Sequence, residues 1–237
     1  MSLWIVIPVR NEEARLAEGL LHLQQAMQSY GFTDYRVLIS DNGSTDATAA
    51  VLERFNREQG TSIGYLRASE VADKGLGIAQ GWAQADASCS VLAYCDIDMA
   101  TDPLALVQGY RLLQSGETSA VAGSRWLAAS EVHGRSWQRS LISAGLSLAW
   151  RLLPQGCITD PGCGLKLVRR EVWLSQSMPA TRYGFAYGAE LLERLNRRGF
   201  TVREIPVHWT DDDARRIRLG QATRDYAQSW WRLLCSN

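Results

Sequence analysis

Two aspartates, Asp96 and Asp98, follow an apolar run over residues 91–94 that predicts a buried strand. Their carboxylates therefore stand at the C-terminal end of that strand. Oxygen ligands suit Mg²⁺ or Mn²⁺, and a carboxylate pair in this position can hold the cation against a diphosphate. The structural alternative is that the two carboxylates are solvated or cap the helix that begins near Asp102 and Pro103.

Polar residues also follow the first apolar run. Directly after Pro8 and Val9 the chain carries Arg10, Asn11, Glu12 and Glu13. A guanidinium, an amide and two carboxylates at a strand end can line a nucleotide base. Alternatively, Asn11 caps the following helix, and the two glutamates interact favourably with its N-terminal dipole.

Asp41 and Lys74 stand at two further places where apolar runs give way to loops. The Asp41 carboxylate can accept a hydrogen bond from N3 of uracil, or it can form an ordinary turn before Gly43. The loop over residues 74–77, Lys-Gly-Leu-Gly, can bind phosphate through its N–H groups and the ammonium. It is not a Walker loop, because the eight-residue spacing and the terminal Lys-Ser/Thr are missing, and it is not a dinucleotide fingerprint.

These residues are positioned by alternating strands and helices. Strands are predicted over residues 3–8, 37–40, 63–66 and 91–95, with helical patterns between them, and later over 120–123, 165–168 and 202–209. Longer helical patterns cover residues 136–153 and 188–198. The alternation favours right-handed βαβ crossovers and a mainly parallel sheet, in which ligands bind beyond the carboxyl ends of the strands.

Composition limits the class of protein. The 237 residues are 46% hydrophobic and carry no net formal charge, so no global field attracts nucleic acid. The five cysteines are odd in number and lack the paired close spacing of a zinc site, which indicates reduced thiols in a cytoplasmic protein. No uninterrupted apolar stretch of about 18 residues is present, so we expect a soluble protein that is at most peripheral to a membrane.

A family resemblance rests on ordered motifs that cover nearly the whole chain. Their order is IPVRNEE (7–13), SDNGSTDAT (40–48), KGLGIAQG (74–81), CDIDMAT (95–101), GSR (123–125), CGLKL (163–167) and IPVHWT (205–210). This set resembles the inverting glycosyltransferases with a GT-A fold, and in particular the polyprenyl (dolichyl)-phosphate glucosyl- and mannosyltransferases. The resemblance implies an α/β fold with a Rossmann-like mixed sheet flanked by helices. It also implies one glycosyltransferase domain over residues 1–237, with a nucleotide-binding half (1–115), an acceptor half (116–215) and a C-terminal amphipathic helix (216–237).

The resemblance also implies roles for single residues. The binding site for uridine or guanosine and for the phosphates of the donor would be lined by Pro8, Arg10, Glu12, Asp41, Lys74 and Asp96. Asp96 and Asp98 would bind a divalent metal, Mn²⁺ or Mg²⁺. Ala100 occupies the place where mannose-transferring relatives often carry a third ligand, so water or phosphate would complete the coordination sphere.

On the acceptor side, Arg125 and Arg139 would hold an acceptor phosphate, and Asp160 and Glu190 would border the acceptor and the donor sugar. All four also have plain structural explanations, as surface arginines, a turn before Pro161 and a local ion pair. The acidic and basic residues at 211–216 replace the usual family turn and form either a closing latch or a solvated loop.

The implied reaction is the inverting transfer of a hexose from a nucleotide sugar, with UDP favoured, to a polyprenyl phosphate. Such a phosphate is already anionic and needs no strong base. A saccharide hydroxyl would need one, with Asp160 as the first candidate and Glu190 as the second. Two other possibilities are a sugar nucleotidyltransferase, which would need a Gly-rich loop at the first strand end, and a non-catalytic nucleotide-binding regulator.

The C-terminal segment carries an apolar stripe flanked by arginines. The stripe consists of Leu219, Tyr226, Trp230, Leu233 and Leu234. A basic helix with tryptophan in its apolar face can lie in a membrane interface, but the same stripe can also pack against the sheet.

Overall fold

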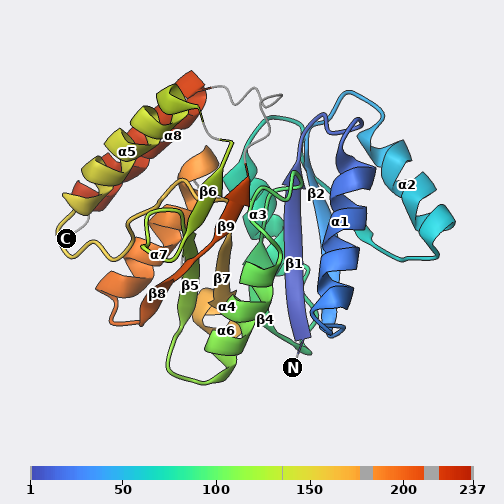
Figure 1. Ribbon diagram of the computed structural model, residues 1–237, viewed down its shortest axis with the longest axis horizontal. Helices are drawn as coiled ribbons and strands as arrows, with labels where there is room; N and C mark the ends of the chain where they lie inside the picture. The colour runs from blue at the N-terminus through green and yellow to red at the C-terminus, as the bar shows by residue number, and fades with distance from the viewer. Residues whose placement is uncertain (1, 135, 177–183, 211–218, 236–237) are drawn as a thin grey trace.

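The computed structural model describes residues 2–134, 136–176, 184–210 and 219–235, and its centre is a seven-stranded sheet (Figure 1). In order across the sheet the strands are β3 (Gly64–Ser69), β2 (Tyr35–Asn42), β1 (Ser2–Val9), β4 (Cys89–Tyr94), β7 (Lys166–Arg169), β5 (Ala120–Ser124) and β8 (Val202–Pro206). Strands β3, β2, β1 and β4 are parallel neighbours, and β8 is parallel to β5. Strand β7 is antiparallel to both β4 and β5, which confirms the predicted mixed sheet.

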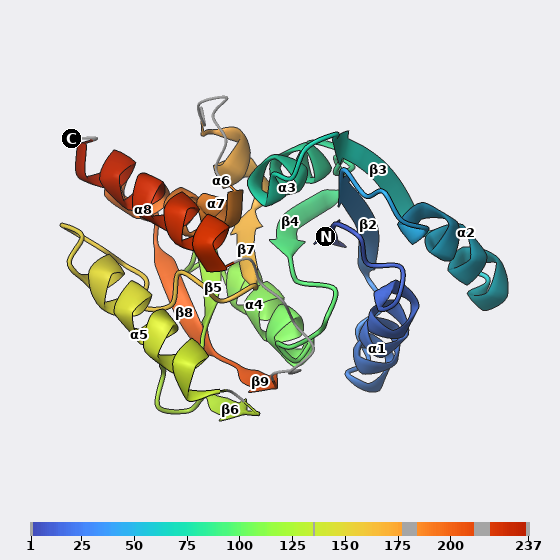
Figure 2. The same ribbon diagram turned by 90° about the horizontal axis from the view of Figure 1, so that it is seen from above.

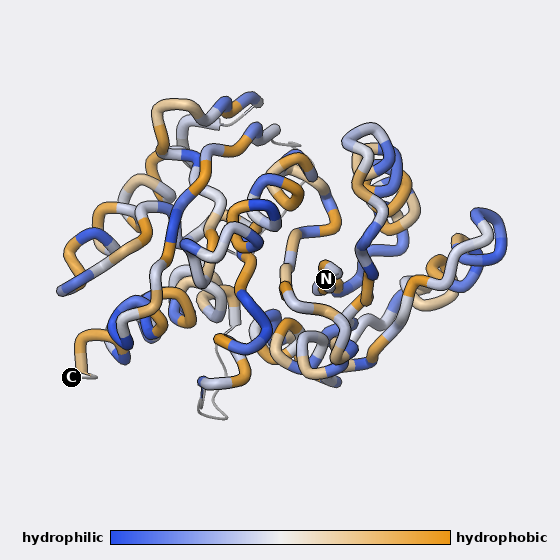
Figure 3. Tube along the Cα trace, turned by 90° about the horizontal axis from the view of Figure 1, so that it is seen from below, coloured by the Kyte–Doolittle hydropathy of each residue, from blue (hydrophilic) through white to orange (hydrophobic). Residues whose placement is uncertain are grey.

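Both faces of this sheet are covered, and β1 shows why. Leu3, Ile5 and Ile7 point into one core, whereas Trp4 and Val6 point into the other. A strand that is buried on both faces is apolar throughout, as the first run of the chain is. Helices α1 (Leu16–Ser29), α2 (Thr48–Gln59) and α4 (Leu104–Gln114) join the first core, and α3 (Lys74–Ala83), α6 (Arg170–Leu174) and α7 (Tyr187–Arg197) lie on the other side (Figure 2). Along the outer helices hydrophobic and hydrophilic segments alternate, as in amphipathic helices that pack one side inward (Figure 3).

Two further helices, α5 (Trp137–Arg151) and α8 (Leu219–Cys235), lie side by side at one end of the sheet (Figures 1 and 2). The indole N–H of Trp230 donates to the carbonyl oxygen of Ala149 at 2.8 Å. The rings of Trp150 and Tyr226 meet edge to face with centroids 5.8 Å apart. In the part of the chain that the structure describes, no helix has both the length and the apolar character needed to cross a membrane.

The predicted strand over residues 202–209 is divided in the structure. Strand β8 ends at Pro206, and β9 (His208–Thr210) pairs instead with β6 (Glu131–His133) in a separate two-stranded sheet. The pairing partner of the chain changes at Val207. The carbonyl of Val207 accepts from the N–H of Glu131, and its N–H donates to Ser130 Oγ. Strand β6 and helix α6 are three and five residues long, too short to be predicted from the sequence pattern.

Candidate functional site

Two cavities lie beyond the carboxyl ends of β1 and β4 and share a wall. The polar cavity, of about 440 Å³, is lined by the predicted site residues Pro8, Arg10, Glu12, Lys74, Asp96 and Asp98, together with other residues. The apolar cavity, of about 540 Å³, lies between α5 and α8 and reaches Arg125. Both cavities are lined by Asp96 and Asp98. The aspartate pair therefore stands where contents of the two cavities would meet.

Lys74 is positioned by the start of α3. The Asp73 carboxylate caps this helix by accepting from the N–H of Leu76, and it also accepts from the N–H of Gly184 in the short helix η1 (Gly184–Ala186). Lys74 is the first residue of α3, and its ammonium lies 2.5 Å from Asp96 Oδ1. Residues 74–77, predicted as a loop, are thus the first turn of α3, and this turn brings a cation to the aspartate pair.

Glu12 adds a third carboxylate to this region. Burial raises the pKa of the Glu12 carboxyl, and the negative charges of Asp98 and Asp96 act in the same direction. An ion pair with Arg15 at 2.8 Å opposes this shift but does not cancel it. The raised pKa therefore reflects chiefly the burial of the carboxyl group, with a smaller contribution from the two neighbouring aspartates.

The donor set around the aspartate pair fits a hard divalent cation. Asp96 and Asp98 offer carboxylate oxygens, and Asp98 Oδ1 is oriented by the N–H of Ala100 at 3.1 Å. Ala100 itself contributes only a methyl group. Among the described residues no group of three acidic, histidine or cysteine side chains could hold a metal. Two protein carboxylates with diphosphate and water oxygens would therefore make up the coordination sphere.

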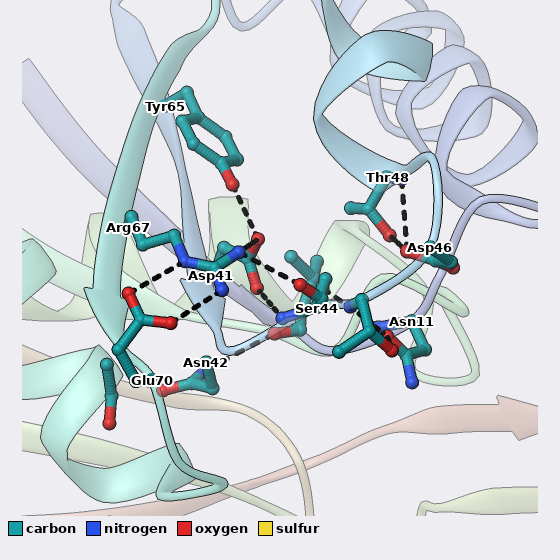
Figure 4. A network of polar contacts seen from close by, with 12 residues as sticks. Asn11, Asp41, Asn42, Ser44, Asp46, Thr48, Tyr65, Arg67 and Glu70 are labelled. Atoms are coloured by element: carbon teal, nitrogen blue, oxygen red, sulfur yellow. Dashed lines mark hydrogen bonds and ion pairs between the residues drawn. The ribbon is translucent and has the colours of Figure 1, made fainter.

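Asp41 lies beside the polar cavity but does not line it, whereas its neighbour Asn42 does. Its fully buried carboxylate accepts from the N–H of Ser44 at 2.8 Å and from the Tyr65 hydroxyl at 2.5 Å (Figure 4). Arg67 Nη1 lies 3.4 Å away. These contacts hold the loop after β2 in place. A contact between Asp41 and a uracil base stays a prediction.

Arg125, which lines the apolar cavity, forms a buried bidentate ion pair with Asp160. Arg125 Nε and Nη2 donate to the two Asp160 oxygens at 2.7 and 2.8 Å, and the Arg125 N–H adds a third bond at 3.0 Å. Burial acts to raise the pKa of the Asp160 carboxyl, but the charge and hydrogen bonds of Arg125 outweigh it and hold the pKa below its usual range. The guanidinium also lies over the ring of Trp209. A carboxylate in this state is a poor proton acceptor at neutral pH, so the geometry favours Asp160 as the residue that orients Arg125.

Glu190 lies outside the lining of both cavities. It is fully buried between α7 and α8, where it pairs with Arg194 at 2.8 Å and Arg232 at 2.7 Å and accepts from Ser229 Oγ at 2.6 Å. These contacts fasten α8 to the rest of the molecule.

Arg139 is in α5, but its side chain lies outside the described part of the structure, as do residues 211–218 with the predicted latch. Roles of Glu190 and Arg139 in sugar transfer stay predictions.

The loop over residues 160–164 lies between the two cavities, and its glycines were not among the predicted site residues. Gly162 and Gly164 line both cavities, and a Cβ on Gly164 would come within 2.1 Å of Asp96 Oδ2. Glu204 accepts from the N–H of Asp160 at 3.0 Å, and the buried Lys166 donates to the carbonyl of Cys163 at 2.7 Å. The spacing of the two glycines was the available signal for a close approach of backbone and carboxylate.

Known proteins include several relatives of this chain. "Glycosyltransferase AglD" of Haloferax volcanii is 26% identical over 235 residues, which cover 97% of this chain but only 37% of that protein. The human protein named dolichyl-phosphate beta-glucosyltransferase is 28% identical over 228 residues, which cover 91% of this chain and 69% of that protein. The chain therefore spans little more than a third of the first relative and about two thirds of the second.

Solved structures share the fold. The crystal structure of glucosyl-3-phosphoglycerate synthase from Mycobacterium tuberculosis superposes with a TM-score of 0.71 at 19% identity and covers 98% of this chain and 80% of that chain. The same enzyme has been solved in complex with Mn²⁺, uridine diphosphate and phosphoglyceric acid. The fold is therefore that of the GT-A glycosyltransferases, as the sequence motifs indicated. The model of the family described as glycosyl transferase family 2 matches residues 4–173, and the chain belongs to this family.

Proposed function

We propose that the protein is a metal-dependent, inverting hexosyltransferase that uses a nucleoside-diphosphate sugar, with UDP favoured, and a polyprenyl phosphate as acceptor. One observation carries this proposal: a charged cavity and an apolar cavity meet at the wall formed by Asp96 and Asp98. A nucleotide sugar is highly polar, whereas a polyprenyl phosphate is apolar except at its head. The curated relatives that are named dolichyl-phosphate beta-glucosyltransferases support the same acceptor.

The polar cavity supplies the groups that a nucleotide sugar requires. Pro8, Arg10 and Glu12 line this cavity and would lie along the nucleoside. Asp41 is buried next to the lining residue Asn42 and stays the predicted base contact. Lys74 would leave Asp96 in part to neutralise the diphosphate, and Asp96 and Asp98 would hold Mn²⁺ or Mg²⁺. The bound cation would stabilise the negative charge that develops on the departing nucleoside diphosphate.

The apolar cavity supplies an anchor for the acceptor head. Asp160 takes two of the five N–H groups of the Arg125 guanidinium and holds its plane, which leaves the others for a phosphate oxygen. Arg139 of α5 is proposed as a second contact. A phosphate oxygen is already anionic, so it can attack the anomeric carbon directly and in line, with inversion. This agrees with the lowered pKa of Asp160 and with the position of Glu190 away from both cavities.

The test is transfer of labelled glucose from UDP-glucose in the presence of Mn²⁺, with a polyprenyl phosphate or an oligosaccharide as acceptor. We expect label in the organic phase only with the lipid phosphate, and an anomeric configuration opposite to that of the donor by NMR. Label found only in the aqueous phase would reject the lipid acceptor. Nucleotide binding without any transfer would favour a regulator, and formation of a nucleotide sugar from a sugar phosphate would favour a nucleotidyltransferase.

Replacing Gly164 with alanine is expected to slow this transfer about 100-fold, since displacements of about 1 Å in a reacting site have effects of this size. The added methyl would push against the Asp96 carboxylate. Steady-state kinetics and circular dichroism measure the loss and check the fold. Gly220→Ala is the matched control, because none of the described residues has an atom within 4 Å of its Cβ position. Equal activity of both variants would contradict the placement of Asp96.

A cytoplasmic location with contact to a membrane surface is also part of the proposal. All five cysteines are free in the structure, as a reducing compartment would maintain them. A polyprenyl acceptor resides in a bilayer, so the enzyme must meet one there.

A further inference from the structure

Over its described side chains, which exclude Leu219, the predicted apolar stripe of α8 is buried or half-buried. Tyr226 and Leu233 of this stripe are buried, and Trp230 lines the apolar cavity and donates to the carbonyl oxygen of Ala149. Ser229 and Arg232 are fastened to Glu190. The described part of the stripe therefore packs against α5 and α7. A contact with a membrane has to be sought on another face.

Helix α5 carries an exposed apolar face, which we define by Trp137, Leu141, Leu148 and Leu152. These side chains are 73%, 67%, 62% and 68% exposed. Their spacings of four, seven and four residues place them on one side of the helix. Figure 2 shows α5 on the outside of the molecule, with α8 beside it. A contiguous row of large apolar side chains of this kind marks an interaction surface.

The charges on α5 indicate what this face contacts. Its sequence contains Arg139 and Arg151 and no acidic residue. Arg151 is exposed in the last turn, and Arg224 is exposed on the neighbouring α8. Asp225, the acidic residue of α8, is half-buried and accepts from the N–H of Phe185. Apolar side chains with tryptophan among them, flanked by exposed arginines, match an anionic lipid surface, into which such helices insert their apolar face.

Ile142 connects the α5 face to the interior. It is 46% exposed, follows Leu141 directly, and also lines the apolar cavity. From there the cavity continues along Leu146 and Trp150 of α5 to Arg125. An apolar chain that lies against the α5 face would thus have a continuous apolar path to the guanidinium. A second copy of the protein on this face would cover the entry at Ile142.

We propose that the α5 face binds the surface of an anionic phospholipid bilayer and that the acceptor chain passes from the bilayer past Ile142 into the apolar cavity. The second part rests on the proposed function, whereas the first part does not. In this proposal α5 makes the contact with the bilayer, and α8 lines the inner side of the path that the acceptor chain follows.

Flotation with vesicles of phosphatidylcholine and phosphatidylglycerol tests the bilayer contact. The double variant Leu141→Gln/Leu148→Gln is expected to weaken partition into the vesicles about tenfold or more, because two inserted side chains become polar. Both residues are exposed, so the fold should persist, which circular dichroism checks. Leu174→Gln on α6, where the side chain is 55% exposed, is the matched control and should float as the wild type does. Equal flotation of the double variant, or no flotation of the wild type, would overturn the proposal.

Transfer assays separate this proposal from the proposed function. With citronellyl phosphate, which is short and water-soluble, the double variant should retain wild-type activity. With a long polyprenyl phosphate in vesicles it should lose activity in parallel with partition. Flotation that depends on the α5 face, without transfer to either acceptor, would support the bilayer contact and overturn the polyprenyl acceptor. A wild-type dimer in sedimentation that the double variant abolishes, with no effect on flotation, would overturn the bilayer contact in favour of a second copy.

Discussion

Replacing Asp98 with asparagine is expected to lower the rate of sugar transfer about 10³-fold, the size of effect seen when one preorganised electrostatic contact to the reacting group is removed. Asp98 lies in the wall between the two cavities, beside Asp96 and within the field of Glu12. Ala100 offers no ligand in its place. With a neutral amide, the pair would hold the cation too weakly to stabilise the leaving diphosphate.

Two measurements separate loss of metal from loss of fold. Calorimetric titration of uridine diphosphate should show that Mn²⁺ strengthens binding to the wild type and has little effect on Asp98→Asn. The matched control is Asp102→Asn in the same loop, where the carboxylate contacts Tyr30 and the N–H of Leu104 and lines neither cavity. This control should keep near-wild-type transfer. Full activity of Asp98→Asn would remove the basis of the proposed reaction.

The sequence was sufficient to predict those site residues that lie at or just after the ends of strands. Pro8 lies near the end of β1, Glu12 follows that strand, and Asp96 follows β4. These strands are parallel neighbours, and the carboxyl ends of such strands meet at one edge of the sheet. Lys74 begins a helix that packs on β1 and β2, so it reaches the same edge. The part of the polar cavity that these residues line was therefore predictable from periodicity and topology.

The acceptor side was less predictable, because its contacts join residues far apart in the chain. Arg125 and Asp160 are separated by 35 residues and meet through a side-chain fork that has no periodic signal. Glu190 carries the same kind of polar side chain as Glu12, but its partners Arg194 and Arg232 make it a structural contact between helices. The antiparallel insertion of β7 and the division of the last strand at Val207 depend on which neighbours are available across the sheet. Such neighbours are set by tertiary packing.

The same limit applies to the apolar helices. The sequence shows Leu141, Leu148 and Leu152 on one side of a helix, and it shows a comparable stripe on α8. Periodicity reveals that a side is apolar but not what covers it. In the structure Tyr226 and Leu233 of the α8 stripe are buried and the α5 face is exposed, because the Glu190 contacts and Trp230 orient α8 toward its neighbours.

Replacing Asp160 with alanine is expected to lower the free energy of unfolding by about 3–5 kcal/mol, as for other buried ion pairs that lose one partner. Arg125 would remain as an unpaired cation, and its side chain is only 8% exposed. The loss should be measured by urea unfolding. The exposed pair between Arg36 and Asp86 is the control, and Asp86→Ala should change stability by about 1 kcal/mol or less.

The pH dependence of this loss follows from the lowered pKa of Asp160. A carboxyl whose pKa is lower in the folded state stabilises the fold fully above its ordinary value of 3.8, and it loses that contribution as the pH falls through the lower folded value. The difference between wild type and Asp160→Ala should therefore be constant from about pH 5 to pH 8 and shrink only below about pH 4. A difference that changed near neutral pH would instead mean that Asp160 titrates there, which is the behaviour required of a general base. Arg125→Met/Asp160→Leu should recover most of the stability but not the affinity for the acceptor phosphate, because the buried charge is gone and so is the guanidinium that would bind the phosphate.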